Sequence, residues 1–230
     1  MSRRRGAVRS ALATAFGFAV VTVLVTAVAA CTVGGEPTPV EAPDLSGQAV
    51  DTGVFPAGAT RVPAPALPGV IADVTGRPLH GEADPARCTP AAVSVDGAAA
   101  SSGPAGTGTA ATLTSLIVSV SESLDQAESL LQRCGTYRTG TAGVATSTIR
   151  TEILPPPTAS AGVDTLALRR TTTTGGEINP LVTSTTTLIG QRDGARVYVE
   201  YRASGGAAMP ADAGTALDAL FQASVAAAWP

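Results

Sequence analysis

Alternating apolar and polar positions mark strands in the second half of the chain. In the segment 111–120, Leu116, Val118 and Val120 share one side, and the segment is dense in β-branched and aliphatic residues. Four further runs of this kind follow, at 144–154, 163–173, 181–189 and 195–202. The last two flank Arg192-Asp193-Gly194, a turn sequence typical of a hairpin.

The last of these runs also predicts which side of the sheet is buried. Val197, Val199 and Tyr201 share one side of it. The opposite side carries Arg196, Tyr198, Glu200 and Arg202. Such alternation is typical of an antiparallel strand with one buried face and one solvated face. The threonine runs 171–174 and 185–187 are likewise expected to be strand surfaces rather than a site.

Two helices are predicted around these strands. Ser121 or Ser123 can cap the first, and Ser123 with Gln126 has the spacing of a capping box. Its apolar face consists of Leu124, Ala127, Leu131 and Cys134, and Gly135 ends it. Pro210 opens the second helix, whose apolar stripe contains Leu217, Leu220, Phe221 and Val225. The expected fold is α+β, an antiparallel sheet of about five strands packed against helices on one face, with one disulfide.

The first thirty residues have the pattern of an export signal. Four arginines within residues 3–9 precede a stretch, 10–35, that lacks any charged residue. The stretch is long enough for a retained membrane helix, but it ends in Val28-Ala29-Ala30-Cys31, the pattern of a bacterial lipobox. We therefore predict a lipoprotein signal peptide at 1–30 and attachment of a diacylglyceryl group to Cys31. An ordinary signal peptide or an uncleaved anchor with an incidental cysteine is the alternative.

The lipid on Cys31 would hold the protein on the extracytoplasmic face of the cell membrane. Residues 31–55 are rich in Pro, Gly, Thr and acidic residues, a composition that predicts a disordered tether. Residues 56–230 are then a single extracytoplasmic α+β domain.

Charge narrows the range of partners. The 230-residue chain has no lysine, which indicates a GC-rich genome such as that of an actinobacterium. Without the four signal arginines, eleven Arg stand against eighteen Asp and Glu, a net charge of −7. An acidic body without a basic stripe argues against binding of nucleic acid.

Cys88 and Cys134 are the two cysteines that remain beside Cys31. In an oxidising compartment, two cysteines form one bridge without ambiguity of pairing. A metal-binding pair or a free reactive thiol is the alternative, although the sequence has no C-x-x-C motif and a single histidine.

Few residues of the chain match a catalytic pattern. The single histidine, His80, lies in a Pro/Gly-rich loop, and the chain has no G-x-S-x-G elbow. Gly106, Gly108 and Ala111 match a loose dinucleotide pattern, for which a plain loop is the simpler interpretation. The acids Glu122, Asp125 and Glu128 could supply a glycosidase pair or form the solvated face of a helix. We predict no catalytic, cofactor-binding or metal-binding residue.

The order of these features resembles a known group of proteins. A lipobox and a Pro-rich tether precede Asp84-Pro85-Ala86-Arg87-Cys88, and a strand and a helix then close at Leu131-Gln132-Arg133-Cys134. This order is similar to that of small mycobacterial and actinobacterial lipoproteins with a domain of unknown function. More distantly, it resembles the extracellular sensor domain of PknH-type receptor kinases, although those sensors have two cysteine pairs.

The resemblance implies an α+β domain with a ligand-binding cleft. The expected function is that of a non-enzymatic ligand-binding or sensor-like domain for a small molecule or an envelope component. The alternatives are a structural or chaperone-like accessory of envelope assembly, and a carboxylate-dependent hydrolase.

Overall fold

Eight antiparallel strands form one sheet in the computed structural model, which describes residues 42–141, 145–176 and 179–230. The spatial order is β1-β2-β3-β8-β7-β6-β5-β4. The strands are β1 (Thr60–Arg61), β2 (Ala99–Pro104), β3 (Thr112–Ser119), β4 (Thr136–Thr141), β5 (Ala145–Leu154), β6 (Asp164–Thr174), β7 (Leu181–Arg192) and β8 (Ala195–Ser204). The predicted α+β class and antiparallel sheet are confirmed, and the five predicted strands are β3 and β5–β8. The predicted strand number was too low.

The three missed strands lack the alternation that marks the others. β2 consists of small residues and ends in Gly103-Pro104, which is typical of a loop. A side chain at Gly103 would place its Cβ 2.1 Å from the Gly58 carbonyl oxygen, so the strand needs glycine where another backbone segment approaches it. β1 has two residues, and β4 is an edge strand.

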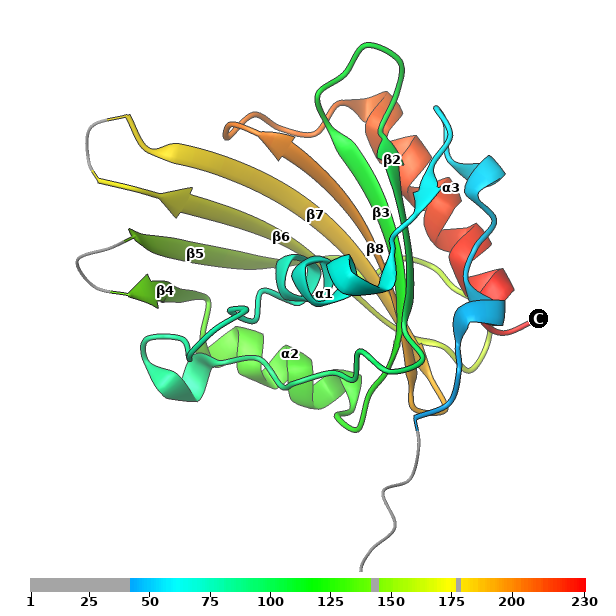
Figure 1. The fold of residues 1–230 in the computed structure, drawn as a ribbon, viewed down its shortest axis with the longest axis horizontal. Helices are drawn as coiled ribbons and strands as arrows, with labels where there is room; N and C mark the ends of the chain where they lie inside the picture. Colours follow the sequence, from blue (N-terminus) through cyan, green and yellow to red (C-terminus); the bar gives the residue numbers. More distant parts are fainter. Residues whose placement is uncertain (1–41, 142–144, 177–178) are drawn as a thin grey trace, which may run out of the picture. The chain divides into compact units, whose positions relative to one another are not determined.

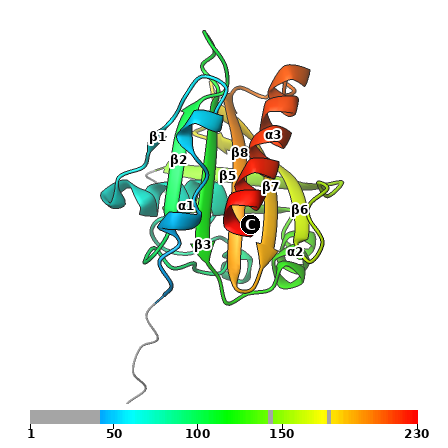
Figure 2. The ribbon, with the colours of Figure 1, turned by 90° about the vertical axis from the view of Figure 1, so that its right-hand side faces the viewer.

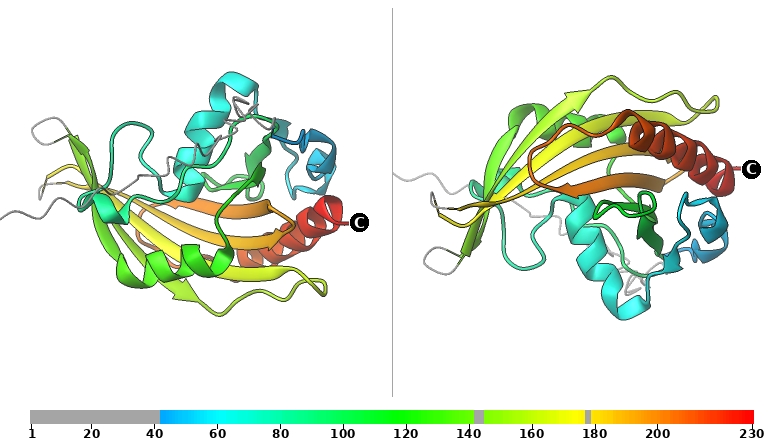
Figure 3. Two further views of the ribbon diagram at one scale, coloured as in Figure 1. Left: turned by 90° about the horizontal axis from the view of Figure 1, so that it is seen from below. Right: turned by 90° about the horizontal axis from the view of Figure 1, so that it is seen from above.

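Helices cover both faces of the twisted sheet (Figures 1, 2 and 3). α3 (Ala211–Ala228) packs on one face, and α1 (Leu67–Thr75) and α2 (Leu124–Arg133) pack on the other. The prediction of helices on one face was therefore wrong. It failed because the two predicted helices, α2 and α3, lie on opposite faces, and an apolar stripe does not tell which face of a sheet it will cover. α1 was not predicted, because it lies in a Pro-rich segment, where Pro68 at the first turn is compatible with a helix.

The predicted capping box of α2 is present. The Ser123 Oγ accepts a hydrogen bond from the Gln126 backbone N–H at 3.2 Å, and Gln126 Oε1 accepts one from the Ser123 N–H at 2.9 Å. Two of the free amides at the helix start are thereby satisfied, which explains why the helix begins at Leu124.

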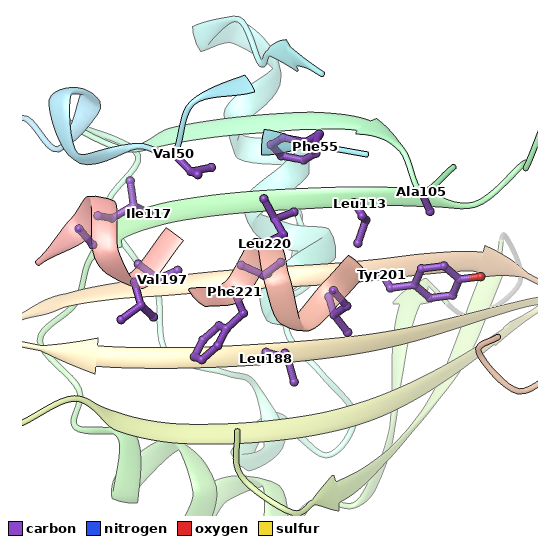
Figure 4. Packing of buried hydrophobic residues seen from close by; sticks show 14 of the residues in the cluster. Val50, Phe55, Ala105, Leu113, Ile117, Leu188, Val197, Tyr201, Leu220 and Phe221 are labelled. Atoms are coloured by element: carbon purple, nitrogen blue, oxygen red, sulfur yellow. The ribbon is translucent and has the colours of Figure 1, made fainter. Parts of the chain in front are cut away.

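The face under α3, here the α3 face, is the larger apolar core. Leu220 and Phe221 of α3 lie against Ile117, Val197 and Leu188 of the sheet (Figure 4). Phe221 has no exposed surface, and it lies beside Gly190, whose missing side chain leaves room for the ring. This stripe of α3 is the one that the sequence predicts.

The folded body begins earlier than residue 56. Leu45, Val50 and Phe55 are each at least 95% buried in the α3-face core, and 3-10 turns form at Ser46–Gln48 and Thr52–Val54. The prediction of disorder is thus wrong for 45–55, because three spaced apolar side chains dock on the sheet despite the polar composition around them. The signal peptide, Cys31 and the first part of the predicted tether lie outside the described residues. Among the described helices, none is long and apolar enough to span a membrane.

The predicted disulfide joins Cys88 to Cys134, with 5.5 Å between their Cα atoms. It links the 3-10 turn Ala86–Cys88 to the residue that follows α2. Both cysteines are buried in a small cluster with Tyr137 and Ile149. The bridge thus fastens the loop after α1 to the sheet through the end of α2.

Candidate ligand-binding site

The face of the sheet under α1 and α2, here the α1/α2 face, is divided into an apolar half and a polar half. Strand register places Leu166, Leu168 and Arg170 of β6 on this face, followed by Thr172 and Thr174. The apolar half packs against the two helices and contains Leu116, Val118, Leu166, Leu168, Ile189 and Tyr198. Beyond it, the same face continues as hydroxyl and charged side chains.

Two arginines lie in one cross-strand row of the polar half. Thr151 pairs with Arg170, Arg170 with Thr185, and Thr185 with Arg202, across β5, β6, β7 and β8. We call these four residues the arginine row. Directly opposite residues in a sheet have neighbouring side chains, so Thr185 lies between two guanidinium groups.

A pocket of about 440 Å³ opens over this row. α1 and the residues after it supply Asp73, Gly76 and Arg77 to its lining, and the sheet supplies Arg170 and Arg202. Six hydroxyl groups complete the polar lining: Thr139, Ser147, Thr172, Thr174, Thr183 and Thr185. The pocket is therefore a polar, hydroxyl-rich one with a cationic floor.

Arg170 fastens α1 to the sheet. Its side chain is 4% exposed, and its Nη atoms donate to the carbonyls of Val74 and Thr75, each at 3.2 Å. The Tyr137 hydroxyl donates to the Gly76 carbonyl at 2.9 Å, and burial raises the pKa of that hydroxyl. These donors satisfy the free carbonyls at the end of α1, where positive charge is also favourable. Gly76 has φ of +74°, and a Cβ there would lie 2.7 Å from the Tyr137 hydroxyl oxygen.

Arg202 is the accessible arginine of the row. Its side chain is 34% exposed and makes ion pairs with Asp73 at 3.2 Å and with Glu200 at 3.3 Å. Glu200 is 1% exposed and also accepts a hydrogen bond from the Thr187 hydroxyl at 3.1 Å. Burial raises the pKa of the Glu200 carboxyl, against the opposing effect of Arg202 and Arg170.

Three buried polar atoms of the row have no hydrogen-bond partner: Thr151 Oγ1, Arg170 Nε and Thr185 Oγ1. Arg170 and Thr185 are at least 93% buried and line the pocket, whereas Thr151 lies outside the lining. Buried polar groups are rarely left unpaired, because doing so forfeits their hydration. The row therefore contains unused hydrogen-bonding capacity, enclosed by protein beneath the surface of the pocket.

A second buried arginine is fully engaged. Arg196 donates to Gln191 Oε1 at 2.7 Å, to the Tyr198 hydroxyl at 3.1 Å and to the Glu122 carbonyl at 3.0 Å. This network holds the approach to α2 against the β7–β8 hairpin. Arg196, Tyr198 and Glu200, which the sequence analysis placed on a solvated face, are all at least 96% buried. That prediction was wrong, because α1 and α2 cover this face of the sheet.

The carboxylate candidates do not converge as a group. Glu122 and Asp125 line a more open groove of about 680 Å³ beside α2. Glu128 accepts a hydrogen bond from the Gln132 side chain at 3.0 Å. Glu122 lies 3.8 Å from the Arg196 guanidinium.

The remaining candidates occupy loops. His80 is exposed in the loop that follows α1. Gly106 and Gly108 lie between β2 and β3, whereas a dinucleotide motif needs a strand followed by a helix. No group of His, Cys, Asp and Glu side chains among the described residues is arranged to hold a metal ion.

None of the residues that line the pocket was predicted as a site, although the sequence contains a signal for them. Hydroxyl and arginine residues run consecutively along β6 and β7, and charged residues alternate along β8, in positions that pair with one another. A face rich in Thr and Arg on three adjacent strands is the pattern that could have found it. The missing information was the strand order, together with the cover that α1 provides.

Comparisons with known proteins give little support for any assignment. No family model matches the chain, and no curated protein matches it. Among solved structures, the chain is similar to an uncharacterised protein, an Rv0999 ortholog, from Mycobacterium smegmatis. The sequence identity is 17%, the TM-score is 0.40, and the match covers 75% of this chain and 86% of that one.

Proposed function

We propose that the protein is a lipid-anchored lipoprotein of the cell envelope that binds a polar, hydroxyl-rich ligand in the pocket over the arginine row. The anchor is the diacylglyceryl group on Cys31, and the domain acts on the extracytoplasmic face of the membrane without catalysis. The lipobox sequence Val28-Ala29-Ala30-Cys31 supports the anchor.

The observation that carries the binding proposal is the polar lining of the pocket, where Arg77, Arg170 and Arg202 lie together with six hydroxyl groups. A sheet that served as scaffold alone would gain from apolar residues at the hydroxyl positions, as it has in the other half of the same face. The pocket volume of about 440 Å³ is within the range of small-molecule sites. A role like that of the PknH-type sensor domains belongs to the same proposal.

Native mass spectrometry of the full-length protein from an actinobacterial host tests both parts of the proposal, the lipid anchor and the bound ligand. We expect the purified protein to carry an acyl-modified Cys31 and a retained compound. Cys31→Ala should accumulate as uncleaved precursor without lipid. The double variant Thr172→Val/Thr183→Val, which removes two paired hydroxyls from the pocket, should lose the retained compound.

The matched control is Thr148→Val, an exposed residue of β5 outside the pocket lining, which should keep the compound. A lipidated protein without any retained compound would contradict the binding half of the proposal. Lipid on Cys31→Ala would contradict the anchoring half.

A further inference from the structure

The pocket has a local charge opposite to that of the whole body. Arg77, Arg170 and Arg202 line it with one acid, Asp73. Glu200 does not line the pocket, but it forms an ion pair with Arg202. If its carboxylate is included, the net charge around the pocket is that of three arginines and two carboxylates, or +1. Residues 31–230 as a whole have eleven arginines and eighteen acids, or −7. A positive pocket in an acidic body attracts anions selectively.

The two carboxylates that pair with Arg202 differ in how firmly they are held. Glu200 is 1% exposed and is fixed by Thr187 as well. The Asp73 side chain is 63% exposed, and a pair of this kind contributes little to stability because water competes for both partners. Asp73 is therefore the carboxylate that an incoming anion can replace.

We propose that the ligand is a sugar or polyol that carries a carboxylate or phosphate group, and that this group displaces Asp73 from Arg202. This inference rests on the proposed binding function and names its chemical class. A guanidinium binds either anion with two parallel hydrogen bonds. The six hydroxyls of the lining suit the neutral part of the ligand.

A titration at low ionic strength tests the inference on the mature protein. The probes are glucose, glucuronate and glucose 6-phosphate, and the readout is the dissociation constant from microscale thermophoresis. Both charged sugars should bind more tightly than glucose. Asp73→Asn, which leaves the buried Glu200–Arg202 pair intact, should tighten the charged sugars by on the order of threefold. Arg202→Lys should weaken them about tenfold, because an ammonium group cannot form the paired hydrogen bonds.

Arg169→Gln is the control. Arg169 is the neighbour of Arg170 on β6, it lies on the other face of the sheet, and its partner is Glu152 at 3.5 Å. This change removes one positive charge from the protein without touching the pocket, so the affinity ratio of charged to neutral sugar should stay unchanged. Vesicles with phosphatidylinositol, against vesicles of phosphatidylcholine, distinguish a lipid headgroup from a free sugar as the source of the anion.

Equal affinities for glucose and the charged sugars, or weaker binding of the charged sugars to Asp73→Asn, would overturn the inference. If glucose binds and the Thr172→Val/Thr183→Val variant loses it, the proposed function still holds while the anion preference fails. If no sugar binds while the native preparation retains another compound, the chemical class is wrong and the binding function stands.

Discussion

The two faces of the sheet are buried in different ways. The α3 face is apolar where one helix of 18 residues covers it, and strand residues of this face beyond that core, such as Arg169, are polar and exposed. The α1/α2 face is covered by helices of 9 and 10 residues, and the strands beneath them change from apolar to polar along their length. Continuous apolar cover gives a core, whereas partial cover over polar rows gives a pocket. The polar half of one face is thus where this fold has room for function.

The largest effect is expected from truncating the core of the α3 face. Phe221→Ala should lower the free energy of unfolding by about 3–5 kcal/mol, because it opens a cavity under a helix that makes much of that core. Urea unfolding of the mature protein measures it. Ala219→Ser, at an exposed position of the same helix, should change stability by about 0.5 kcal/mol or less. A loss below about 1 kcal/mol for Phe221→Ala would mean that the two faces do not differ as described.

The next largest effect is expected from removing the disulfide that holds the α1/α2 face together. The double variant Cys88→Ser/Cys134→Ser should lose about 2–4 kcal/mol, because the bridge closes a loop with a sequence separation of 46 residues. Urea unfolding again gives the measurement, and the wild-type protein treated with a reductant should match the variant. An unchanged midpoint in both would show that the short helices stay docked without the bridge.

The smallest effect is a pH dependence of protein stability, which tests the burial of the Glu200 carboxyl in the polar half of the α1/α2 face. Burial raises the pKa of Glu200 above its ordinary value of 4.5, so the folded protein holds this proton more tightly than the unfolded chain does. Wild-type stability should therefore fall relative to Glu200→Gln as pH rises from about 4.5 through the raised pKa. Thermal melting of both proteins between about pH 4 and 8 gives the difference directly.

The control for this comparison is Glu82→Gln, since Glu82 is exposed in the loop that follows α1. Its melting curve should run parallel to that of the wild type. Parallel curves for Glu200→Gln as well would contradict the described burial of the carboxylate.

The two faces of the sheet also differ in how much of their structure could be predicted from the sequence. The stripe of α3 and the alternation of β8 are local patterns, so both were predicted, down to Phe221 and Val199. Whether Arg196 and Glu200 are buried depends on the helices that cover their face of the sheet. One of these helices, α1, lies more than a hundred residues earlier in the chain, so no local pattern reveals it. Periodicity reports which residues share a face, but it carries no information on whether that face meets water.

The same limit explains the error at the start of the domain. Composition predicted a tether through residue 55, yet Leu45, Val50 and Phe55 dock on the sheet. Three apolar side chains in a polar segment are too few to form a pattern, and their burial depends on a surface that α3 and β2 complete.

Because α1 has only nine residues, the pocket depends on a helix that can unfold locally. A helix of this length is marginal by itself in water, so α1 owes its structure to Arg170, Tyr137 and the sheet. Amide hydrogens of α1 should exchange with solvent through a local opening that leaves β6–β8 protected. Because α1 supplies one wall of the pocket, each such opening would also abolish the binding site. A bound ligand should consequently slow exchange in α1 more than anywhere else in the protein.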